Sequence, residues 1–491
     1  MSVLAIDAGT TGVTALLVAA DTSVLSQGYS EFPQHFPASG WVEHDLEQVW
    51  RATLAAVGQC LENVNETPVC VGVTNQRETI ALWDRTTLQA PRRAIVWQDR
   101  RTAGLCEQWR HDGYGSLVAS RTGLRLDPYF SASKLTWIRV NEPQVWRGVD
   151  EGRTCIGTID TYLIARMSGG REHVTDSSNA SRTMLFDIHQ ARWDPELCGL
   201  AGVPMSALPQ VVPSIGGNVR TDPEHFPGLA LPVSGIAGDQ QAAMFGQMCF
   251  DVGSSKCTYG TGSFVLTNTG SQVPKSQAGL LSTVAWSDAD GALTYALEGS
   301  VFVTGAAVQW LRDGLQIIKS ADEVEALANS VESSEGVVFV PALTGLGAPD
   351  WDPTARGTIL GISRGTTKAH IARAALEAIA FQVRDVVDLA RQDANVSLRS
   401  LAVDGGASAN NLLCQLQADQ INAPVVRPKN LETTGVGVAF MAGLGHGVWG
   451  SRTELASAWQ LDRTFSPGDR DDAAHRRWRA AIDRAKGWTE R

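Results

Sequence analysis

The segment "SVLAIDAGTTGVTALLVA" (residues 2–19) contains two apolar runs separated by a short turn of small residues. The first run, at 2–7, is rich in β-branched and aliphatic side chains, and apolar residues resume at 13–19 after the turn "AGTTG". Strand, Gly/Thr turn and strand together predict a β-hairpin. Residues 22–31, "TSVLSQGYSE", could supply a third antiparallel strand.

A similar pattern returns in the second half of the chain, in "SSKCTYGTGSFVLTNTG" (254–270). In both halves a predicted hairpin with a Gly/Thr turn is followed by alternating helical and strand segments. The two halves thus share a predicted order of elements, an echo between the halves, without a short-period sequence repeat. A chain of 491 residues is also too long for a single core. We therefore expect two α/β domains, at 1–246 and 247–491, packed directly on each other.

The composition of the chain argues against several classes of function. The net charge of -11 argues against non-specific nucleic-acid binding, for which a basic face is expected. The apolar run at the N-terminus stops at Asp7, too early for a signal peptide, and no run reaches the ~18 residues that a membrane span needs. The cysteines form no Cys-x-x-Cys pair, so we expect free thiols in a reducing cytoplasm and no zinc site.

Three turns of small residues follow predicted strands: "DAGTTG" (7–12), "YGTGS" (259–263) and "DGGASAN" (404–410). Each is either an ordinary tight turn or a loop whose backbone N–H groups and hydroxyls cradle phosphate. Asp7 stands where a strand ends, a suitable place to hold Mg²⁺ through water. Because none of the turns fits the common nucleotide fingerprints, phosphate binding here would be of a two-lobed kind.

Polar residues follow a buried strand at "NQRE" (75–78). Arg77 and Glu78 are either a surface ion pair or a donor and an acceptor for a small polyhydroxylated ligand. Trp97 and Tyr129 are either packing residues or the flat apolar wall of the same site. The stretch "SGIAGDQQAAMFGQ" (234–247) surrounds Asp239 with small residues and amides, which suits a helix N-cap or a site that a ligand approaches closely.

Taken in order, several segments resemble the FGGY family of carbohydrate kinases and, within it, the members that act on glycerol. They are "VTNQRET" (73–79), "IVWQDRRT" (95–102), "LDPYFSASKLTW" (126–137), "GIAGDQQAAMFGQ" (235–247), "YGTGSF" (259–264), "TGLGAPDWDPTARGTILG" (344–361) and "VDGGASAN" (403–410). The resemblance implies two actin-like (ribonuclease H-like) ATPase domains around a central cleft. It also implies ATP-dependent phosphorylation of glycerol with Mg²⁺ by a cytoplasmic dimer or tetramer.

The resemblance also assigns roles to single residues. Asp239 is the expected general base, and Asp7 is the expected carboxylate on the Mg²⁺ side. The expected glycerol ligands are Arg77, Glu78, Tyr129, Asp239 and Gln240, with Trp97 and Phe264 as an aromatic pair at the apolar edge of the triol. The expected contacts of the nucleotide and its phosphates are Thr10, Thr11, Gly12, Thr261, Gly305, Gln309, Gly406 and Asn410.

The chain departs from the family pattern at three positions. Ala8 replaces a Gln and Thr14 replaces an Arg in the first turn region, and Asp350 replaces an aromatic residue. These departures concern nucleotide handling more than polyol recognition. Lys256 and Arg364 are the candidates for a cation that replaces the missing Arg.

Two other functions stay open at this point. One is a kinase for another small polyol or a ketopentose, and the other is a non-catalytic actin-like sensor, against which the intact Asp7 and Asp239 argue. His225 lies in "EHFPG". It is either an ordinary loop histidine or, as in some family members with a similar context, a site that a phosphocarrier protein phosphorylates.

Overall fold

The computed structural model describes residues 1–62, 64–276 and 279–490, and its first half is built on a six-stranded sheet. The strand order is β14–β15–β6–β1–β2–β3. The bounds are β1 (Ser2–Ala8), β2 (Gly12–Ala19), β3 (Val24–Glu31), β6 (Cys70–Asn75), β14 (Ile215–Arg220) and β15 (Pro232–Gly238). The predicted hairpin and its third antiparallel strand are confirmed. β15, β6 and β1 are parallel neighbours.

The second half is built on a seven-stranded sheet, in the order β18–β19–β17–β16–β22–β23–β24. The bounds are β16 (Ser255–Tyr259), β17 (Ser263–Gly270), β18 (Leu281–Ser287), β19 (Leu293–Val301), β22 (Leu401–Asp404), β23 (Val425–Pro428) and β24 (Leu461–Phe465). β16 and β17 form a hairpin, and β22 runs parallel to β16. The arrangement of β2, β1 and β6 is thus repeated by β17, β16 and β22, as the echo between the halves predicts.

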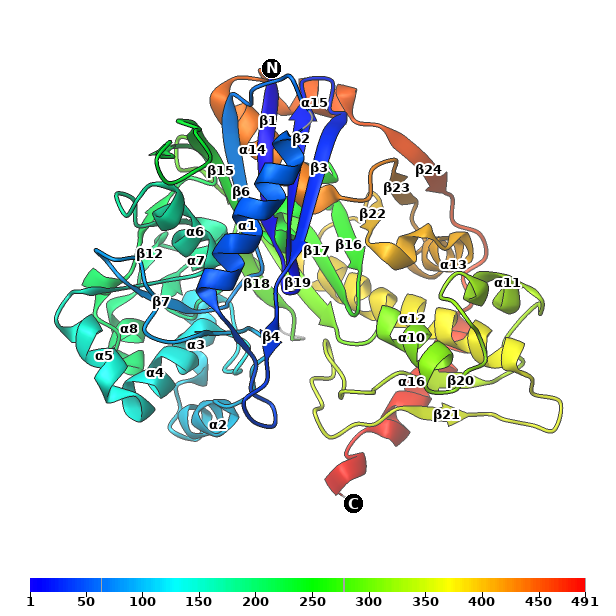
Figure 1. The fold of residues 1–491 in the computed structure, drawn as a ribbon. Helices are drawn as coiled ribbons and strands as arrows, with labels where there is room; N and C mark the ends of the chain where they lie inside the picture. Colours follow the sequence, from blue (N-terminus) through cyan, green and yellow to red (C-terminus); the bar gives the residue numbers. More distant parts are fainter. Residues whose placement is uncertain (63, 277–278, 491) are drawn as a thin grey trace.

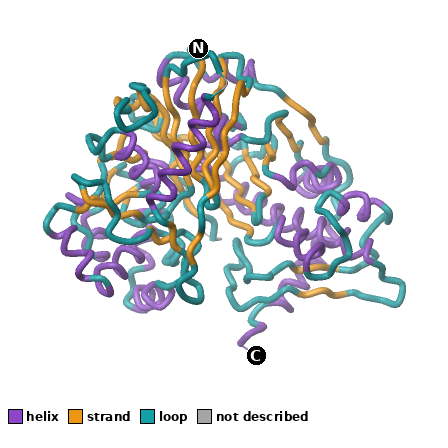
Figure 2. The backbone as a smooth tube through the Cα atoms, viewed as in Figure 1, coloured by secondary structure: helices purple, strands orange, loops and turns teal. Residues whose placement is uncertain are grey.

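Helices and short strands flank the two sheets (Figures 1 and 2). In the first half they are α1 (Leu46–Leu61), α2 (Ala103–His111), α3 (Gly115–Thr122), α4 (Ser131–Asn141), α5 (Pro143–Asp150), α6 (Ile159–Met167), α7 (Ser177–Ala180), α8 (Pro195–Ala201) and η1 (Met205–Ala207), with strands β4 (Gln34–His35), β5 (Glu43–His44), β7 (Ala81–Asp84), β8 (Ala94–Ile95), β9 (Thr154–Gly157), β10 (Val174–Asp176), β11 (Phe186–Asp187), β12 (Arg192–Trp193) and β13 (Gln210–Val212). In the second half they are α10 (Gly305–Asp313), α11 (Glu323–Asn329), α12 (Lys368–Ala394), η2 (Gly406–Ala409), α13 (Asn411–Ile421), α15 (Arg452–Ala458), α16 (Asp472–Ala485) and η3 (Trp488–Glu490), with strands β20 (Val338–Val340) and β21 (Thr358–Leu360).

Two helices, α9 (Asp239–Gly246) and α14 (Thr433–His446), join the halves. They share one hydrophobic core with side chains from both sheets, including Leu16 of β2 and Leu266 of β17. α14 belongs to the second half of the chain, yet it packs on β15, β6 and β1 of the first sheet. The two halves therefore interlock, and the division at residue 246 stays a prediction.

Two expectations from composition can be compared with the structure. All eight cysteines are buried free thiols, as predicted. Among the helices of the described residues, none combines the length and the apolar character that crossing a membrane requires.

Candidate active site

The topology of the first sheet gathers the predicted site residues at one edge. β15, β6 and β1 are parallel neighbours, so their C-terminal ends lie next to one another. Asp239 follows β15, Arg77 and Glu78 follow β6, and Asp7 is the last residue but one of β1. Side chains that are up to 232 residues apart in sequence are thus brought to one place by strand order alone.

Arg77 lies at the centre of this cluster and is buried. Its Nε lies 3.3 Å from Asp239 Oδ1, and its Nη2 donates to the Tyr129 hydroxyl at 3.4 Å. Its two Nη atoms also donate to the carboxylate of Glu298, at 2.5 and 3.0 Å. Arg77 therefore contacts two of the other predicted substrate ligands, Tyr129 and Asp239.

Glu298 and Arg182 complete a buried network of alternating charges that the sequence did not reveal. Arg182 donates from Nε to Glu78 at 2.8 Å and from Nη2 to Glu298 at 2.9 Å. Burial alone would raise the pKa of Glu298, but Arg182 and Arg77 outweigh it and bring that pKa down to about 2. Arg182 stands in "VTDSSNASRTMLFD" (174–187) and Glu298 in "ALEGSVF" (296–302), and neither segment shows a ligand pattern.

The backbone at Glu78 is in the left-handed region, with φ of 62°. A non-glycine residue rarely adopts this conformation, and such strain tends to collect at functional sites. Ser131 at the start of α4 donates from Oγ to the Glu78 carbonyl oxygen at 2.9 Å. The surrounding structure therefore fixes Glu78 in an orientation that an unconstrained chain would avoid.

Asp239 is the first residue of α9, and Gly238 is the N-cap. The N-cap interpretation of Asp239 is therefore wrong by one residue. The Asp239 carboxylate accepts from the backbone N–H of its neighbour Gln240 at 2.7 Å. Burial raises the pKa of Asp239, and the cations Arg77 and Lys256 oppose that shift. The Asp239 side chain keeps 28% of its surface exposed whereas Arg77 keeps 1%, so Asp239 is the accessible face of the cluster.

The predicted aromatic residues border the same cluster. Trp97 packs edge-on against Tyr129, with ring centroids 5.6 Å apart, and its Nε1 donates to Thr10 Oγ1 at 3.1 Å. Phe264 of β17 lies beneath the Arg77 guanidinium, whose Cζ is 5.9 Å from the centroid of the Phe264 ring. Trp97 thus connects a predicted substrate residue with the first Gly/Thr turn.

The Gly/Thr turns of the second half also come together. Gly305 N at the start of α10 donates to Gly260 O at 3.0 Å, and Ala306 N donates to Thr261 O at 3.1 Å. A Cβ on Gly305 would lie 2.6 Å from Gly260 O, and one on Gly405 would lie 2.5 Å from Tyr259 O. Such approaches admit only glycine, so the turn between β16 and β17, the start of α10 and the turn after β22 form one surface.

The other predicted nucleotide contacts differ in how accessible they are. Thr11, Thr261, Gln309 and Gly406 are exposed, whereas Gly12 is buried. Gln309 lies one turn beyond Gly305 on α10. The Asn410 side-chain oxygen caps α13 by accepting from Leu413 N at 2.9 Å. Its backbone N–H donates to Ala407 O and its carbonyl oxygen accepts from Cys414 N, so its amide nitrogen is the group left to face a ligand.

Asp7 is the predicted Mg²⁺ residue, and it lies in an acidic environment. Burial and the nearby carboxylates of Asp239 and Glu432 raise its pKa to about 8. Within the described residues, no three His, Cys, Asp or Glu side chains are arranged to hold a metal directly. The assignment of Mg²⁺ to Asp7 therefore stays a prediction.

The departures from the family pattern have structural counterparts. Asp350 accepts from Arg479 of α16 at 2.9 Å and pairs with Lys486 just beyond that helix, so it anchors the C-terminal helix. Lys256 and Arg364 are the two candidates for the missing cation. Lys256 is buried within the site, whereas Arg364 is exposed between β21 and α12.

His225, the candidate for modification by a phosphocarrier protein, is exposed in the segment between β14 and β15.

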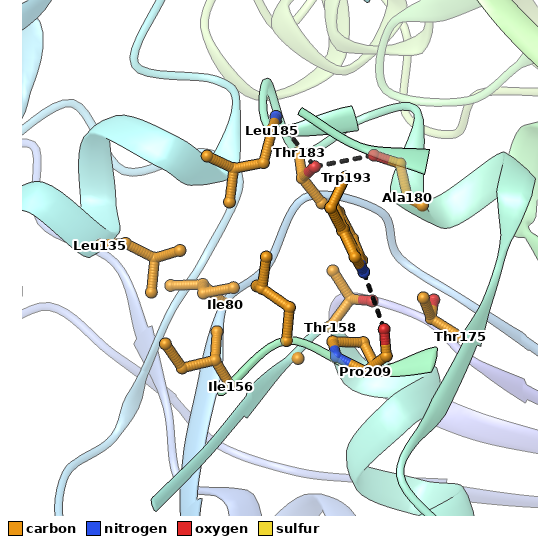
Figure 3. Close-up of a pocket in the computed structure, with 12 residues that line it drawn as sticks. Ile80, Leu135, Ile156, Thr158, Thr175, Ala180, Thr183, Leu185, Trp193 and Pro209 are labelled. Carbon is orange, nitrogen blue, oxygen red and sulfur yellow. Dashed lines mark hydrogen bonds between the residues drawn. The ribbon is translucent and has the colours of Figure 1, made fainter. Parts of the chain in front are cut away.

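A small cavity in the first half is lined by Ile80, Leu135, Ile156 and Trp193 among others (Figure 3). Its polar groups already have partners: Trp193 Nε1 donates to Pro209 O at 2.8 Å, and Thr183 Oγ1 donates to Ala180 O at 2.7 Å. An apolar cavity with satisfied polar groups does not suit a polyol.

Comparison with known proteins identifies the family. Residues 2–246 match the N-terminal domain of the FGGY family of carbohydrate kinases, and residues 255–446 match its C-terminal domain. A protein named glycerol kinase from Saccharolobus islandicus is 50% identical over 99% of this chain and 97% of its own, and one from Dechloromonas aromatica is 51% identical over 99% and 98%. The crystal structure of Plasmodium falciparum glycerol kinase with ADP superposes with a TM-score of 0.92 at 34% identity, covering 99% of this chain and 98% of that one. The chain therefore belongs to the FGGY family of carbohydrate kinases, and the predicted two-domain α/β fold is confirmed.

Proposed function

We propose that this chain transfers the terminal phosphoryl group of ATP to glycerol, giving sn-glycerol 3-phosphate, with Asp239 as general base. The observation that carries the proposal is the contact of Asp239 with Arg77 and of Arg77 with Tyr129, beside Glu78. Relatives at about half identity over nearly the whole chain bear the name glycerol kinase. Charged donors and acceptors beside aromatic rings form the mixed surface that a small triol needs.

The reacting hydroxyl is placed at Asp239, whose exposed carboxylate accepts its proton as the new bond to phosphorus forms. Phosphoryl transfer proceeds through a loose transition state, so the protein chiefly positions the reactants and neutralises charge. The other hydroxyls are held by Arg77, Glu78 and Tyr129. The buried network with Glu298 keeps these groups in place before the substrate arrives, which lowers the cost of binding.

The nucleotide is placed between the Gly/Thr turns of the two halves. Thr10 and Thr11 contact phosphate from one side, Thr261 from the other, and Gly305, Gln309, Gly406 and Asn410 contact the remainder. Asp7, whose carboxyl group lies near that of Asp239, would hold the Mg²⁺ ion. When bound, the ion supplies positive charge to the phosphate oxygens.

An assay of ADP release with a panel of polyols tests this proposal. We expect glycerol to be the preferred acceptor and 1,2-propanediol to be far poorer, because a missing hydroxyl leaves buried polar groups unpaired. A preference for a tetritol or a ketopentose would contradict the substrate assignment. No turnover with any of these acceptors would favour a non-catalytic sensor.

The variant Asp239→Asn tests the base. Its amide keeps the shape of the carboxylate but cannot accept the proton, so we expect kcat to fall by roughly 10²–10⁴-fold while glycerol binding persists. Asp469→Asn changes an exposed carboxylate elsewhere in the same way and serves as the control. A kcat near that of the unmodified enzyme for Asp239→Asn would exclude this residue as the base.

The remaining proposals concern the setting of the enzyme. Eight buried thiols suit a reducing cytoplasm, and the resemblance favours a dimer or tetramer, which light scattering would establish. The exposed His225 is the proposed target of a phosphocarrier protein. Mass spectrometry after incubation with such a system would show the modification, and an unmodified His225 would end the idea.

A further inference from the structure

A lysine side chain is completely buried in the active site, at Lys256 of β16. Its Nζ donates to the side-chain oxygen of Gln240 and, at 2.9 Å, to Thr258 Oγ1. Burying an ammonium group is costly unless it is well paired. A lysine at this position therefore calls for an explanation beyond packing.

Two carboxylates near Lys256, those of Asp404 and Asp239, favour its charged form. Burial lowers its pKa, and these carboxylates act against that shift. An ammonium has three donors and no acceptor. Whatever faces Lys256 must therefore present an oxygen.

This constraint decides the orientation of the Gln240 amide. Its oxygen must face Lys256, so its NH₂ group points away from the lysine. Gln240 directly follows Asp239, and its backbone N–H donates to Asp239 Oδ1 at 2.7 Å. The Asp239 carboxylate thus offers a hydrogen-bond acceptor, and the NH₂ group of the neighbouring Gln240 offers a donor.

We infer that Lys256 is a positioning residue: it locks the Gln240 amide so that its NH₂ group is presented as a donor beside the Asp239 carboxylate, for a substrate hydroxyl oxygen. The inference rests on the proposed function, in which Gln240 is a glycerol ligand. Lys256 is the group that makes Gln240 a donor rather than an acceptor toward the substrate.

The second amide after Asp239 is fixed by the same principle. Arg77 Nη1 donates to the side-chain oxygen of Gln241 at 3.3 Å, and Gln241 Nε2 donates to Val284 O at 3.2 Å. Each of the two glutamines therefore has its amide oxygen on a buried cation. This explains why amides rather than carboxylates follow Asp239, since carboxylates would offer no donor on the opposite side.

A double-mutant cycle tests the inference with Lys256→Met, Gln240→Ala and the double variant, using the full chain. We expect Lys256→Met to raise the glycerol KM about tenfold or more, because the amide can then turn its oxygen toward the hydroxyl. In the Gln240→Ala background the same change should alter KM less than about twofold. Thr258→Val removes the other partner of Lys256 and is the matched control, with KM expected to stay near that of the unmodified enzyme. Effects that multiply in the double variant would overturn the inference, because Lys256 would then act independently of Gln240.

Gln240→Glu provides a test that leaves Lys256 intact, in case Lys256→Met does not fold. Glu keeps an oxygen for the ammonium but replaces the NH₂ group by a second acceptor. We expect glycerol affinity, measured by calorimetry without nucleotide, to fall as far as in Gln240→Ala. Unchanged affinity would overturn the donor assignment. Turnover of glycerol by the unmodified enzyme distinguishes failure of the proposed function from failure of this inference. If the unmodified enzyme does not turn over glycerol, the proposed function fails. If it does, these variants test only the role of Lys256.

Discussion

Thr14 lies directly across the hairpin from Asp7, since the two residues are paired in the register of β1 and β2. Opposite residues in an antiparallel pair place their side chains on the same face. An arginine at position 14, as in the family pattern, would therefore lie beside the carboxylate whose pKa is raised to about 8. The departure at Thr14 leaves the Gly/Thr turn at residues 7–12 without that cation.

Thr14→Arg should lower the KM for MgATP. A charged hydrogen bond to phosphate is typically worth about 1.5–3 kcal/mol, which corresponds to roughly ten- to a hundredfold. Thr14→Met adds a long side chain without charge and is the control. KM is measured at saturating glycerol, and a KM in the Arg variant that is equal or higher would mean that the loop already compensates for the missing arginine.

Asp160 gives a prediction about pH and stability. It is buried and accepts from Thr158 at 2.5 Å and from Thr175 at 2.6 Å, and burial raises its pKa to about 7. Between pH ~4 and ~7 the folded protein holds a proton that the unfolded chain has released, so its free energy of unfolding falls as pH rises, by up to about 1.4 kcal/mol per pH unit.

Asp160→Asn removes this titration, because the amide stays neutral at every pH. Relative to the unmodified protein, the variant should therefore gain stability steadily from pH 5 to pH 7 and keep the gain above that. Urea unfolding at several pH values measures the difference, in which all other titrating groups cancel. A difference that does not change with pH would show that Asp160 ionises normally in the folded protein.

Some residues of the candidate site could be predicted from short sequence motifs, whereas others could not. Arg77, Glu78 and Asp239 follow strands that end at one sheet edge, and each stands in a short motif, so a single segment indicates each of them. Glu298 lies 221 residues from Arg77 and inside a strand. Its role depends on how the second sheet packs against the first, which no local pattern contains.

At the scale of elements, the contact between α9 and α14 depends on missing side chains. A Cβ on Gly437 of α14 would lie 1.9 Å from the carbonyl oxygen of Ala242 in α9. A Cβ on Gly246 of α9 would lie 2.2 Å from Thr433 O. Glycine is costly in a helix interior, so at these positions close packing outweighs helix propensity.

Gly437→Ala should therefore destabilise the protein although alanine favours helix. The added methyl must push the two helices apart, and overpacking of this kind costs about 1–3 kcal/mol. Gly58→Ala in α1 is the matched control, because no atom lies within 4 Å of its Cβ, and it should stabilise by up to about 1 kcal/mol. Thermal unfolding of both variants gives the comparison, and equal shifts in Tm would contradict the packing argument.

Elements with strong local signals were predictable, but their partners were not. The two hairpins follow from apolar runs around Gly/Thr turns, and α12 follows from its long alanine-rich pattern. α14 is different, because its apolar and glycine-rich sequence fits several buried positions. Its place on the first sheet is set by the complementary glycines Gly72 and Gly235, which only the folded structure brings under it.

At the scale of the whole molecule, the second half of the chain supplies part of the core of the first. Residues 433–458, the crossing segment, form α14 and α15 and contribute Phe440 and Leu455 to the core shared by both sheets. Trp449 Nε1 donates to Ala20 O at 2.9 Å, and Thr22 Oγ1 donates to Ala458 O at 3.0 Å. The chain then returns to the second sheet through β24.

A fragment of residues 1–246 should therefore not fold cooperatively by itself. It would expose the face of β15, β6 and β1 that α14 covers, and an exposed apolar face of this kind promotes aggregation. Joining the crossing segment to residue 246 through a flexible linker should restore a soluble fragment with a single urea transition. The control fusion carries residues 368–394 instead, the helix α12, which packs on β17 and β19 of the second sheet. If the fragment of residues 1–246 unfolds as cooperatively as the fusion with the crossing segment, the first half is an independent domain and the boundary at residue 246 is a true folding boundary.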